Sequence, residues 1–348
     1  MQHHFQNWQP QPDQPFNPNS PKQLKLALAS LGIEVNSTAK EKLEPLSDQP
    51  VIADLLQYKY WKSQDSKYVD KIRQAVHPET NRIHAQYFQL GADTGRLSCR
   101  KPPLQQMPRH DQVRSCFTPT AGEKFIIADY SQIELRVMAQ ISQDQKMIVA
   151  YQQGQDLHKL TASLITDTPM TEVTSEQRQA AKAINFGLFF GMGTEGLCAY
   201  ARNTFAVDMS LSQARHFKDR FFHNYQGFNT YYQKMKRTKI KRLTSLSGRI
   251  RHFTSGNASL TQALNTPVQG TAADIIKRAL ADLLIKLRDK RAKIVACIHD
   301  EIILEVKEKH TETTKQILEQ VMISAGEYYL TDVPVVVEAT IAESWAGK

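Results

Sequence analysis

Cysteine is scarce in this chain, and no apolar run approaches the ~20 residues that a membrane-spanning helix needs. The cysteines, Cys99, Cys116, Cys198 and Cys297, lie far apart and form no C-x-x-C pair. The N-terminus shows no signal-peptide pattern, and no internal repeat is visible. These absences argue against a secreted disulfide scaffold and a membrane protein, and they predict a reduced, cytoplasmic setting.

Acidic residues are outnumbered by basic ones. Lys and Arg total 44 against 35 Asp and Glu, which leaves a net charge of +9 over 348 residues. This surplus favours an anionic partner such as nucleic acid, although a solvated basic surface gives the same balance. The length allows about two domains. The first residues, rich in Gln, Pro and Asn, predict a flexible N-terminus, with His3 and His4 in a tail rather than in a metal site.

Hydrophobic patterning predicts an α+β core that is interrupted by a long helical insertion. Ser20 and Pro21 mark a capped helix start, and Gly32 marks its end. The other expected helices are 51–72, one from Ser131, most of 144–240, 270–290 and 311–329. The expected strands are 82–89, 124–129, a hairpin around Asp300 and 333–342, with a turn-rich stretch at 244–257.

The segment CIHDEIILEV, residues 297–306, places three ionisable side chains at the tip of the predicted hairpin. It lacks the Asn-Gly or Asp-Gly pair of an ordinary tight turn, and its adjacent acids Asp300 and Glu301 repel each other. Asp129 ends another apolar strand, so neighbouring strands would bring Asp129 and Asp300 to one edge. Two such carboxylates suit Mg²⁺ and two-metal phosphoryl or nucleotidyl transfer. Alternatively, each Asp is an ordinary strand-end residue.

Four side chains recur every four residues on the segment 175–193: Arg178, Lys182, Phe186 and Phe190. Two cations followed by two rings on one helix face can hold a triphosphate and stack a base and its sugar. The alternative is a solvated basic end followed by an aromatic stripe that faces the core.

Three further residues each have an ordinary structural interpretation that competes with a functional one. Glu134 completes a Ser131-x-x-Glu134 capping box, which alone explains a helix start. His158 either reaches a phosphate or lies on a helix surface. Arg96 follows a glycine in a loop, where it either enters a minor groove or remains an ordinary surface residue.

Five segments together resemble the DNA polymerase A family, of the DNA polymerase I type. They are TGRLS (94–98), ADYSQIELRVMAQIS (128–142), SEQRQAAKAINFGLFFGMG (175–193), NTPVQGTAADIIKRA (265–279) and HDEIILEV (299–306). The resemblance implies a polymerase right-hand fold of the α+β class, with an antiparallel palm sheet, a mainly helical fingers lobe and a truncated helical thumb. The expected domains are 1–65 (thumb remnant), 66–140 and 254–348 (palm) and 141–253 (fingers).

The same resemblance implies roles for individual residues. Asp129, Asp300 and the backbone carbonyl of Tyr130 match metal ligands for two Mg²⁺ ions, with Mn²⁺ as an alternative, and Glu301 is their acidic companion. Positions that handle the incoming dNTP are matched by Arg178, Lys182 (also the proton donor to pyrophosphate), His158, Phe186, Glu134, Gln132, Tyr130 and Phe190. Contacts to primer terminus and template are matched by Arg96, Asn265, Gln269 and His299.

The chain departs from the family pattern in three places. Phe190 stands where the family usually has Tyr, and Thr261 stands where it commonly has Arg. Little sequence precedes the segment FNPNSPKQL, so we expect a shortened thumb and no exonuclease domain. This last departure predicts an enzyme without proofreading and of low processivity, unless a second protein supplies the missing grip.

Three functions remain open at this stage. A template-directed DNA polymerase that binds primer–template DNA and dNTPs agrees with all the segments above. A catalytically weak accessory protein that binds primer–template DNA is the alternative suggested by the short thumb and Thr261. An RNA polymerase of related fold is disfavoured, because the carboxylate of Glu134 beneath the sugar would clash with a 2′-hydroxyl.

Overall fold

The computed structural model describes residues 2–5, 15–108, 111–254 and 256–347. The chain divides into two compact units, Met1–His84 and Ala85–Lys348. The predicted domain boundaries at 65/66, 140/141 and 253/254 stay predictions. None of the described helices is long and apolar enough to cross a bilayer.

The first unit is helical, and its core forms as the sequence predicts. The side chain of Ser20 accepts a hydrogen bond from the backbone N–H of Gln23, which caps helix α1 one residue before Pro21. Leu24 and Leu28 of this helix are buried against Ile52 of the next long helix. The helices are α1 (Pro21–Ala29), α2 (Lys40–Leu43), α3 (Pro50–Gln64) and α4 (Asp70–Ala75), with a π-helical turn at Asp65–Val69 and 3₁₀ turns at Gln2–Phe5 and Glu44–Leu46.

Part of the N-terminus expected to be flexible is ordered. Phe5 is buried, and its ring packs 4.9 Å from that of Phe16. The ring Nε2 of His4 lies 3.1 Å from a carboxylate oxygen of Asp54. The remainder of the predicted flexible segment, residues 6–14, and the side chain of His3 lie outside the described residues.

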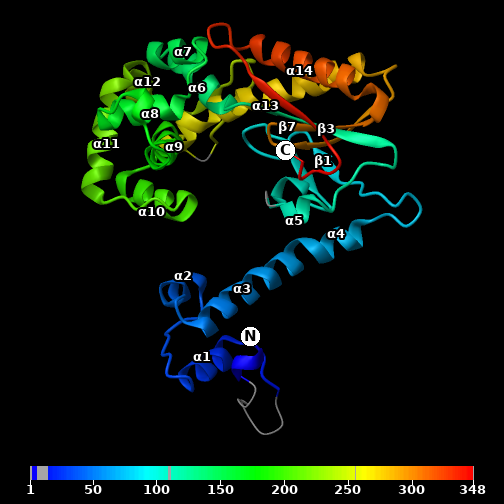
Figure 1. Ribbon diagram of the computed structural model, residues 1–348. Coiled ribbons are helices and arrows are strands. Elements are labelled where there is room, and N and C mark those ends of the chain that lie inside the picture. Colours follow the sequence, from blue (N-terminus) through cyan, green and yellow to red (C-terminus); the bar gives the residue numbers. More distant parts are fainter. Residues whose placement is uncertain (1, 6–14, 109–110, 255, 348) are drawn as a thin grey trace. The chain divides into compact units, whose positions relative to one another are not determined.

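The second unit contains the expected antiparallel sheet (Figure 1). Its strand order is β6-β7-β3-β8, and all three strand pairs are antiparallel. The central strands β3 and β7 are apolar and almost wholly buried, as their continuous hydrophobic runs predict. The strands are β3 (Glu123–Tyr130), β6 (Ala292–Ile298), β7 (Glu301–Lys307) and β8 (Val337–Ala342); two small hairpins pair β1 (Gln86–Phe88) with β2 (Ser98–Arg100) and β4 (Arg242–Thr244) with β5 (Ile250–His252).

Helices cover this sheet and form the expected helical lobe. Helices α13 and α14 pack against each other, and α14 also contacts β3, β7 and β8 (Figure 1). Helices α8 to α12 pack in succession around a cluster of buried aromatic rings. The helices are α5 (Asp111–Arg114), α6 (Ile133–Ser142), α7 (Gln145–Gln152), α8 (Leu157–Thr166), α9 (Ser175–Phe189), α10 (Thr194–Phe205), α11 (Leu211–Asn224), α12 (Gln226–Arg237), α13 (Leu260–Lys286) and α14 (Thr311–Glu327); 3₁₀ turns lie at Leu104–Gln106, Met170–Glu172 and Glu308–His310.

Some predicted boundaries were wrong. Helix α13 begins at Leu260, ten residues before the predicted start at 270, because a capping box between Ser259 and Gln262 satisfies its first amides. Pro267 lies inside this helix, where the surrounding buried packing stabilises it. The strand predicted at 82–89 shortens to Gln86–Phe88, since its partner β2 has only three residues.

Candidate active site

The two aspartates singled out in the sequence lie at the same end of the sheet. Asp129 is the penultimate residue of β3, and it pairs in register with Glu301, the first residue of β7. The backbone N–H of Tyr130 donates to the carbonyl oxygen of Asp300 at 3.3 Å. Asp300 lies in the tight β6–β7 turn, which His299 enters with φ of 59°. The prediction that these strands are neighbours is therefore confirmed.

Glu301 is held by other groups of the protein. Its carboxylate accepts a hydrogen bond of 2.8 Å from the indole Nε1 of Trp345 and lies 3.7 Å from Nη1 of Arg114. The guanidinium of Arg114 stacks 4.3 Å from the Trp345 ring centre. Glu301 is buried, so this cation and this indole offset the cost of burying its charge. Its role as an acidic companion to a metal stays a prediction.

The donor set at the sheet end fits Mg²⁺. Asp129, Asp300 and the main chain of Tyr130 present hard oxygen atoms, and Mg²⁺ commonly binds through one or two carboxylates plus substrate phosphates and water. Within the described part of the chain, no group of three or more His, Cys, Asp and Glu side chains is arranged to hold a metal ion.

Glu134 does not cap its helix, and this expectation was wrong. The backbone pairing between β3 and β8 continues one residue beyond β3, because the N–H of Ser131 donates to the carbonyl of Val336 at 2.9 Å. Gln132 then adopts a left-handed conformation with φ of 54°, and it is Gln132 that precedes the helix, without a side-chain cap. The carboxylate of Glu134 instead forms an ion pair with the guanidinium of Arg96.

Arg96, which pairs with Glu134, also lies near Asp300 in the β6–β7 turn. Burial lowers the pKa of the Arg96 guanidinium, and the nearby charge of Asp300 opposes the shift. A cation therefore lies near both Glu134 and Asp300. The side chain of Gln132, two residues before Glu134, is also held in place, because the hydroxyl of Tyr151 donates to its oxygen at 3.2 Å.

Helix α9 presents the predicted row of cations and rings. Arg178 is already oriented, since its Nε lies 2.7 Å from the carboxylate of Asp156, the N-cap of α8. One turn on, the ammonium of Lys182 lies 5.9 Å from the ring centre of Phe205. The rings of Phe186 and Phe190 stack at 6.4 Å, although Phe190 is the C-cap and so lies just outside the helix.

His158 is buried beneath this row and is neutral. Burial lowers its pKa to about 4; Asp156 opposes this shift, while Arg178 and Lys182 add to it. Its Nδ1 lies 2.8 Å from the amide nitrogen of Asn185.

The tautomer of His158 follows from its neighbours. The nitrogen of the Asn185 amide faces Nδ1 of His158, while the amide oxygen faces the Thr161 hydroxyl; because an amide nitrogen can only donate, Nδ1 accepts. The proton of the neutral ring is therefore on Nε2. Sequence reasoning missed Asn185, although a polar residue within the apolar segment INFG was a usable signal.

The predicted DNA-contacting residues lie on accessible positions. Asn265 and Gln269 are half-buried positions, one turn apart, in a stretch of α13 whose other residues from 263 to 270 are buried. The amide of Asn265 donates to the carbonyl of Thr261 at 2.8 Å. His299 lies in the same turn as Asp300, with its Nε2 3.1 Å from the carbonyl oxygen of Gln105.

Comparison with known proteins identifies the family of the chain. The model of DNA polymerase family A matches residues 2–347. DNA polymerase I of Aquifex aeolicus (strain VF5) is 35% identical over 94% of this chain and 58% of that protein. The thermostable DNA polymerase I of Thermus aquaticus is 33% identical over 95% of this chain and 42% of that protein. The chain thus spans between about two fifths and three fifths of these two relatives.

A solved structure has the same fold. The POL domain of Pol1 from M. smegmatis, in complex with DNA primer-template and dNTP, aligns with a TM-score of 0.83 and 30% identity, covering 95% of this chain and 62% of that chain. The family match covers nearly the whole sequence, and the sheet and the helical lobe agree with the mixed helix and sheet fold of that structure. The chain belongs to DNA polymerase family A.

Proposed function

We propose that this chain is a template-directed DNA polymerase that adds deoxynucleotides to a primer 3′-hydroxyl. The observation that carries the proposal is the convergence of Asp129 and Asp300 at one end of the β3–β7 pair. The primer oxygen attacks the α-phosphate of the incoming dNTP, a new phosphodiester bond forms, and pyrophosphate leaves.

Asp129, Asp300 and the carbonyl of Tyr130 would hold two Mg²⁺ ions. When bound, these ions supply charge neutralisation at the phosphates and acidify the attacking hydroxyl. Oxygen ligands do not decide between Mg²⁺ and Mn²⁺. The contribution of the chain is to fix Asp129 on strand β3 and Asp300 in the adjoining tight turn, with Arg96 offsetting the charge of Asp300.

The row on α9 receives the triphosphate. Arg178 is positioned by Asp156 before a nucleotide arrives, which lowers the entropic cost of forming a charge-assisted contact. His158 offers a neutral Nε2–H donor that its buried partner Asn185 keeps in one orientation. Lys182, one turn further along, donates a proton to the leaving pyrophosphate.

The sugar and base lie against aromatic and carboxylate groups. Phe186 packs against the deoxyribose and Phe190 stacks near the base. Glu134, held by Arg96, lies beneath the ribose and excludes a 2′-hydroxyl. Gln132 borders the same pocket.

The new base pair and the primer end lie against four donors. Arg96, Asn265, Gln269 and His299 contact the primer terminus and the template. Thr261 offers a hydroxyl where the family commonly has an Arg, so one charged contact is replaced by a weaker one.

Absence of proofreading, low processivity and the need for a second protein stay predictions. Primer extension by the isolated chain under a single-hit trap tests them. Short products without removal of a mismatched primer end are expected, and runs of hundreds of nucleotides would contradict the prediction.

The decisive test of the active site is Asp300→Ala. Extension of a primer in the presence of Mg²⁺ should fall about a thousandfold or more, because several kcal/mol of transition-state stabilisation is lost. Binding of primer–template DNA, measured by fluorescence anisotropy, should persist. The matched control is Asp208→Ala, which removes an exposed carboxylate on the helical lobe.

Three outcomes separate the candidate functions. A wild-type chain that binds primer–template DNA but extends nothing would favour the accessory DNA-binding protein. Extension that survives Asp300→Ala would refute the site assignment. Incorporation of ribonucleotides as fast as deoxynucleotides would refute the role of Glu134.

A further inference from the structure

Two arginines of the β4–β5 hairpin connect parts of the chain that the proposed reaction must keep in register. Arg249 and Arg251, two residues apart at β5, each donate to the loop before β2 and to helix α13. We call these two residues the arginine clamp.

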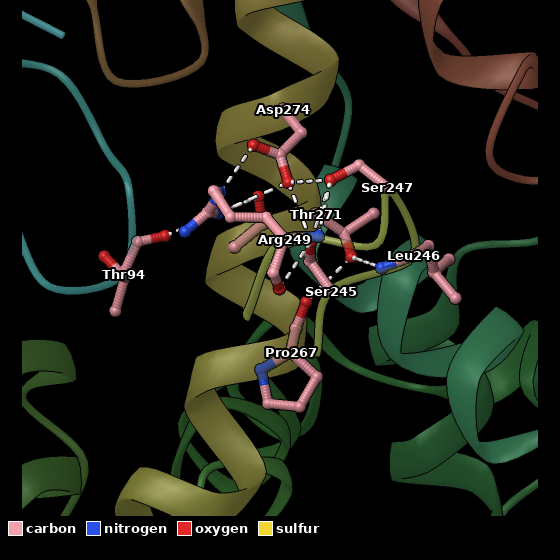
Figure 2. Close-up of polar contacts among 9 residues, drawn as sticks. Thr94, Ser245, Leu246, Ser247, Arg249, Pro267, Thr271 and Asp274 are labelled. Carbon is pink, nitrogen blue, oxygen red and sulfur yellow. Dashed lines mark hydrogen bonds and ion pairs between the residues drawn. The ribbon is translucent and has the colours of Figure 1, made fainter. Parts of the chain in front are cut away.

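Arg249 makes the more extensive contacts (Figure 2). Its Nη2 donates to the carbonyl oxygens of Thr94 at 2.8 Å and Gly270 at 2.9 Å. Its Nε donates to the carboxylate of Asp274 at 2.9 Å. The second oxygen of Asp274 accepts from the hydroxyls of two serines on the hairpin. The guanidinium therefore ties the loop and the helix through partners that are themselves held.

Two glycines make room for the Arg249 guanidinium. A Cβ atom added to Gly95 would overlap this group, and Gly95 also adopts a φ of +82° that favours glycine. A Cβ atom added to Gly270 would lie 2.9 Å from Nη2 of Arg249, which is too close without a shift. The guanidinium thus fills a slot between the loop and α13.

Arg251 forms a second connection of the same kind. Its Nη2 lies 2.8 Å from the carboxylate of Asp93 in the loop, and its Nη1 donates to the hydroxyl of Thr266 at 3.1 Å. Thr266 and Gly270 are one turn apart on α13, so the two arginines grip successive turns.

The positions that the clamp holds on α13 and in the loop lie next to or near predicted DNA contacts. Asn265 precedes Thr266, and Gln269 precedes Gly270, while Arg96 follows the loop residues Asp93 and Thr94 by two or three positions. The clamp therefore sets the separation between Arg96 and the two amides. Watson–Crick pairs present acceptor atoms at regular places in the minor groove, so donors at a fixed separation favour a correctly shaped pair.

We propose that Arg249 and Arg251 are positioning residues that make extension sensitive to a mismatch at the primer terminus. The inference rests on the proposed polymerase function. The clamp does not touch DNA in this scheme; it holds the donors that do.

Arg249→Lys tests the proposal, because lysine keeps the charge but cannot reach all three acceptors with one planar group. The readout is the ratio of extension rates from matched and mismatched primer ends, per active site. The ratio should fall about tenfold, the factor expected when one positioned hydrogen bond is lost. Arg220→Lys is the control, since Arg220 also binds a carbonyl, that of Leu164, and a carboxylate, that of Asp167, away from the clamp.

A purely structural role would lower stability or the fraction of active enzyme, but it would leave the ratio unchanged. An unchanged ratio in a folded Arg249→Lys protein therefore overturns the proposal. Asp274→Asn, a milder loosening of the same guanidinium, should shift the ratio in the same direction and covers the case in which Arg249→Lys does not fold.

Amide hydrogen exchange separates this inference from the proposed function. Arg249→Lys should raise exchange in the loop 91–98 about tenfold relative to Arg220→Lys, whether or not the wild type extends primers. Unchanged exchange overturns the clamp. If the wild type extends no primer, the proposed function is refuted, and with it the effect on mismatches. If Arg249→Lys nevertheless raises exchange in the loop, the role of the clamp in positioning the loop stands.

Discussion

At the scale of single residues, the candidate site depends on a buried polar chain beneath α9. His158, Asn185, Thr161 and Tyr225 are linked in series by hydrogen bonds of 2.7–2.9 Å. All four are buried, and each link satisfies a group that would otherwise be costly to bury. This series of hydrogen bonds explains how His158, which lies near the cations Arg178 and Lys182, is held neutral and in one tautomer.

This neutral histidine predicts a pH dependence of stability. The pKa of His158 is about 4 in the folded protein against 6.5 in a model peptide, so the unfolded chain binds the proton more tightly. Stability should therefore be complete above pH 6.5 and fall as the pH drops toward 4, by up to about 3 kcal/mol.

Urea unfolding at several pH values measures this effect. The His158→Gln variant should show a flatter dependence between pH 6.5 and 4 than the wild type. The exposed His216→Gln should not differ from the wild type. Equal slopes in all three proteins would contradict the assignment of a buried neutral histidine.

Phe186 predicts how the chain treats chain-terminating nucleotides. Phe186 has no hydroxyl that could replace the missing 3′-hydroxyl of a dideoxynucleotide, so we expect discrimination against such nucleotides, and Phe186→Tyr should relax it by about tenfold through one new hydrogen bond. The measurement is the ratio of kcat/KM for dNTP and ddNTP. Phe217→Tyr, a half-buried ring on α11, is the control. An unchanged ratio would remove Phe186 from the sugar pocket.

At the scale of elements, a single carboxylate joins two helices of the lobe. Asp144 is the N-cap of α7, and its side chain accepts hydrogen bonds from the N–H groups of Met147 at 3.2 Å and Phe228 of α12 at 3.1 Å. Gly227 allows this approach, since a Cβ atom there would lie 2.8 Å from the backbone nitrogen of Asp144.

Asp144→Ala should therefore cost more than an ordinary cap. It leaves two buried N–H groups without this acceptor, so a loss of about 2–4 kcal/mol in the free energy of unfolding is expected. Ser210→Ala, at the exposed cap of α11, is the matched control and should cost about 1 kcal/mol. Equal costs in denaturant melts would show that Asp144 does not couple α7 to α12.

Elements with strong local signals were predicted well. The N-cap of α1, the apolar strand β3 and the hairpin β6–β7 were all confirmed, because their patterns are contained in short stretches of sequence. The start of α6 was not. There the pairing of Ser131 with Val336, distant in sequence, prevailed over a locally favourable capping box.

At the scale of the whole molecule, charge is unevenly distributed along the chain. No Asp or Glu occurs between Asp219 and Asp274, whereas the same stretch contains the basic run KMKRTKIKR at 234–242. Ile240 and Leu243 anchor this run on Ala263 of α13, while its lysines and arginines are exposed. The basic run is thus an ordered surface that packs against α13, the helix that bears Asn265 and Gln269.

Neutralising this surface should weaken the salt dependence of DNA binding. Lys236→Gln, Lys239→Gln and Lys241→Gln combined should lower the slope of log Kd against log salt concentration by about 2–3, if each lysine faces a phosphate. The control removes the same charge elsewhere, with Lys286→Gln, Lys290→Gln and Lys309→Gln. Identical slopes for the two triple variants would exclude a specific contribution of the run.

The sequence by itself determined the family, the α+β composition and most of the candidate residues. These follow from local information: apolar runs that end in Asp129 and Asp300, the four-residue spacing on α9, and five segments in one order. Spacing within one helix or strand suffices to place side chains on one face.

Only the tertiary structure decided the partners of those residues. Arg96 meets Glu134, Asn185 orients His158, Trp345 holds Glu301, and the arginine clamp joins Thr94 to Gly270. Each of these contacts links segments far apart in sequence, and burial makes each polar group require a partner. Which partner satisfies it depends on how strands and helices pack, and a periodic pattern along one element contains no information on that.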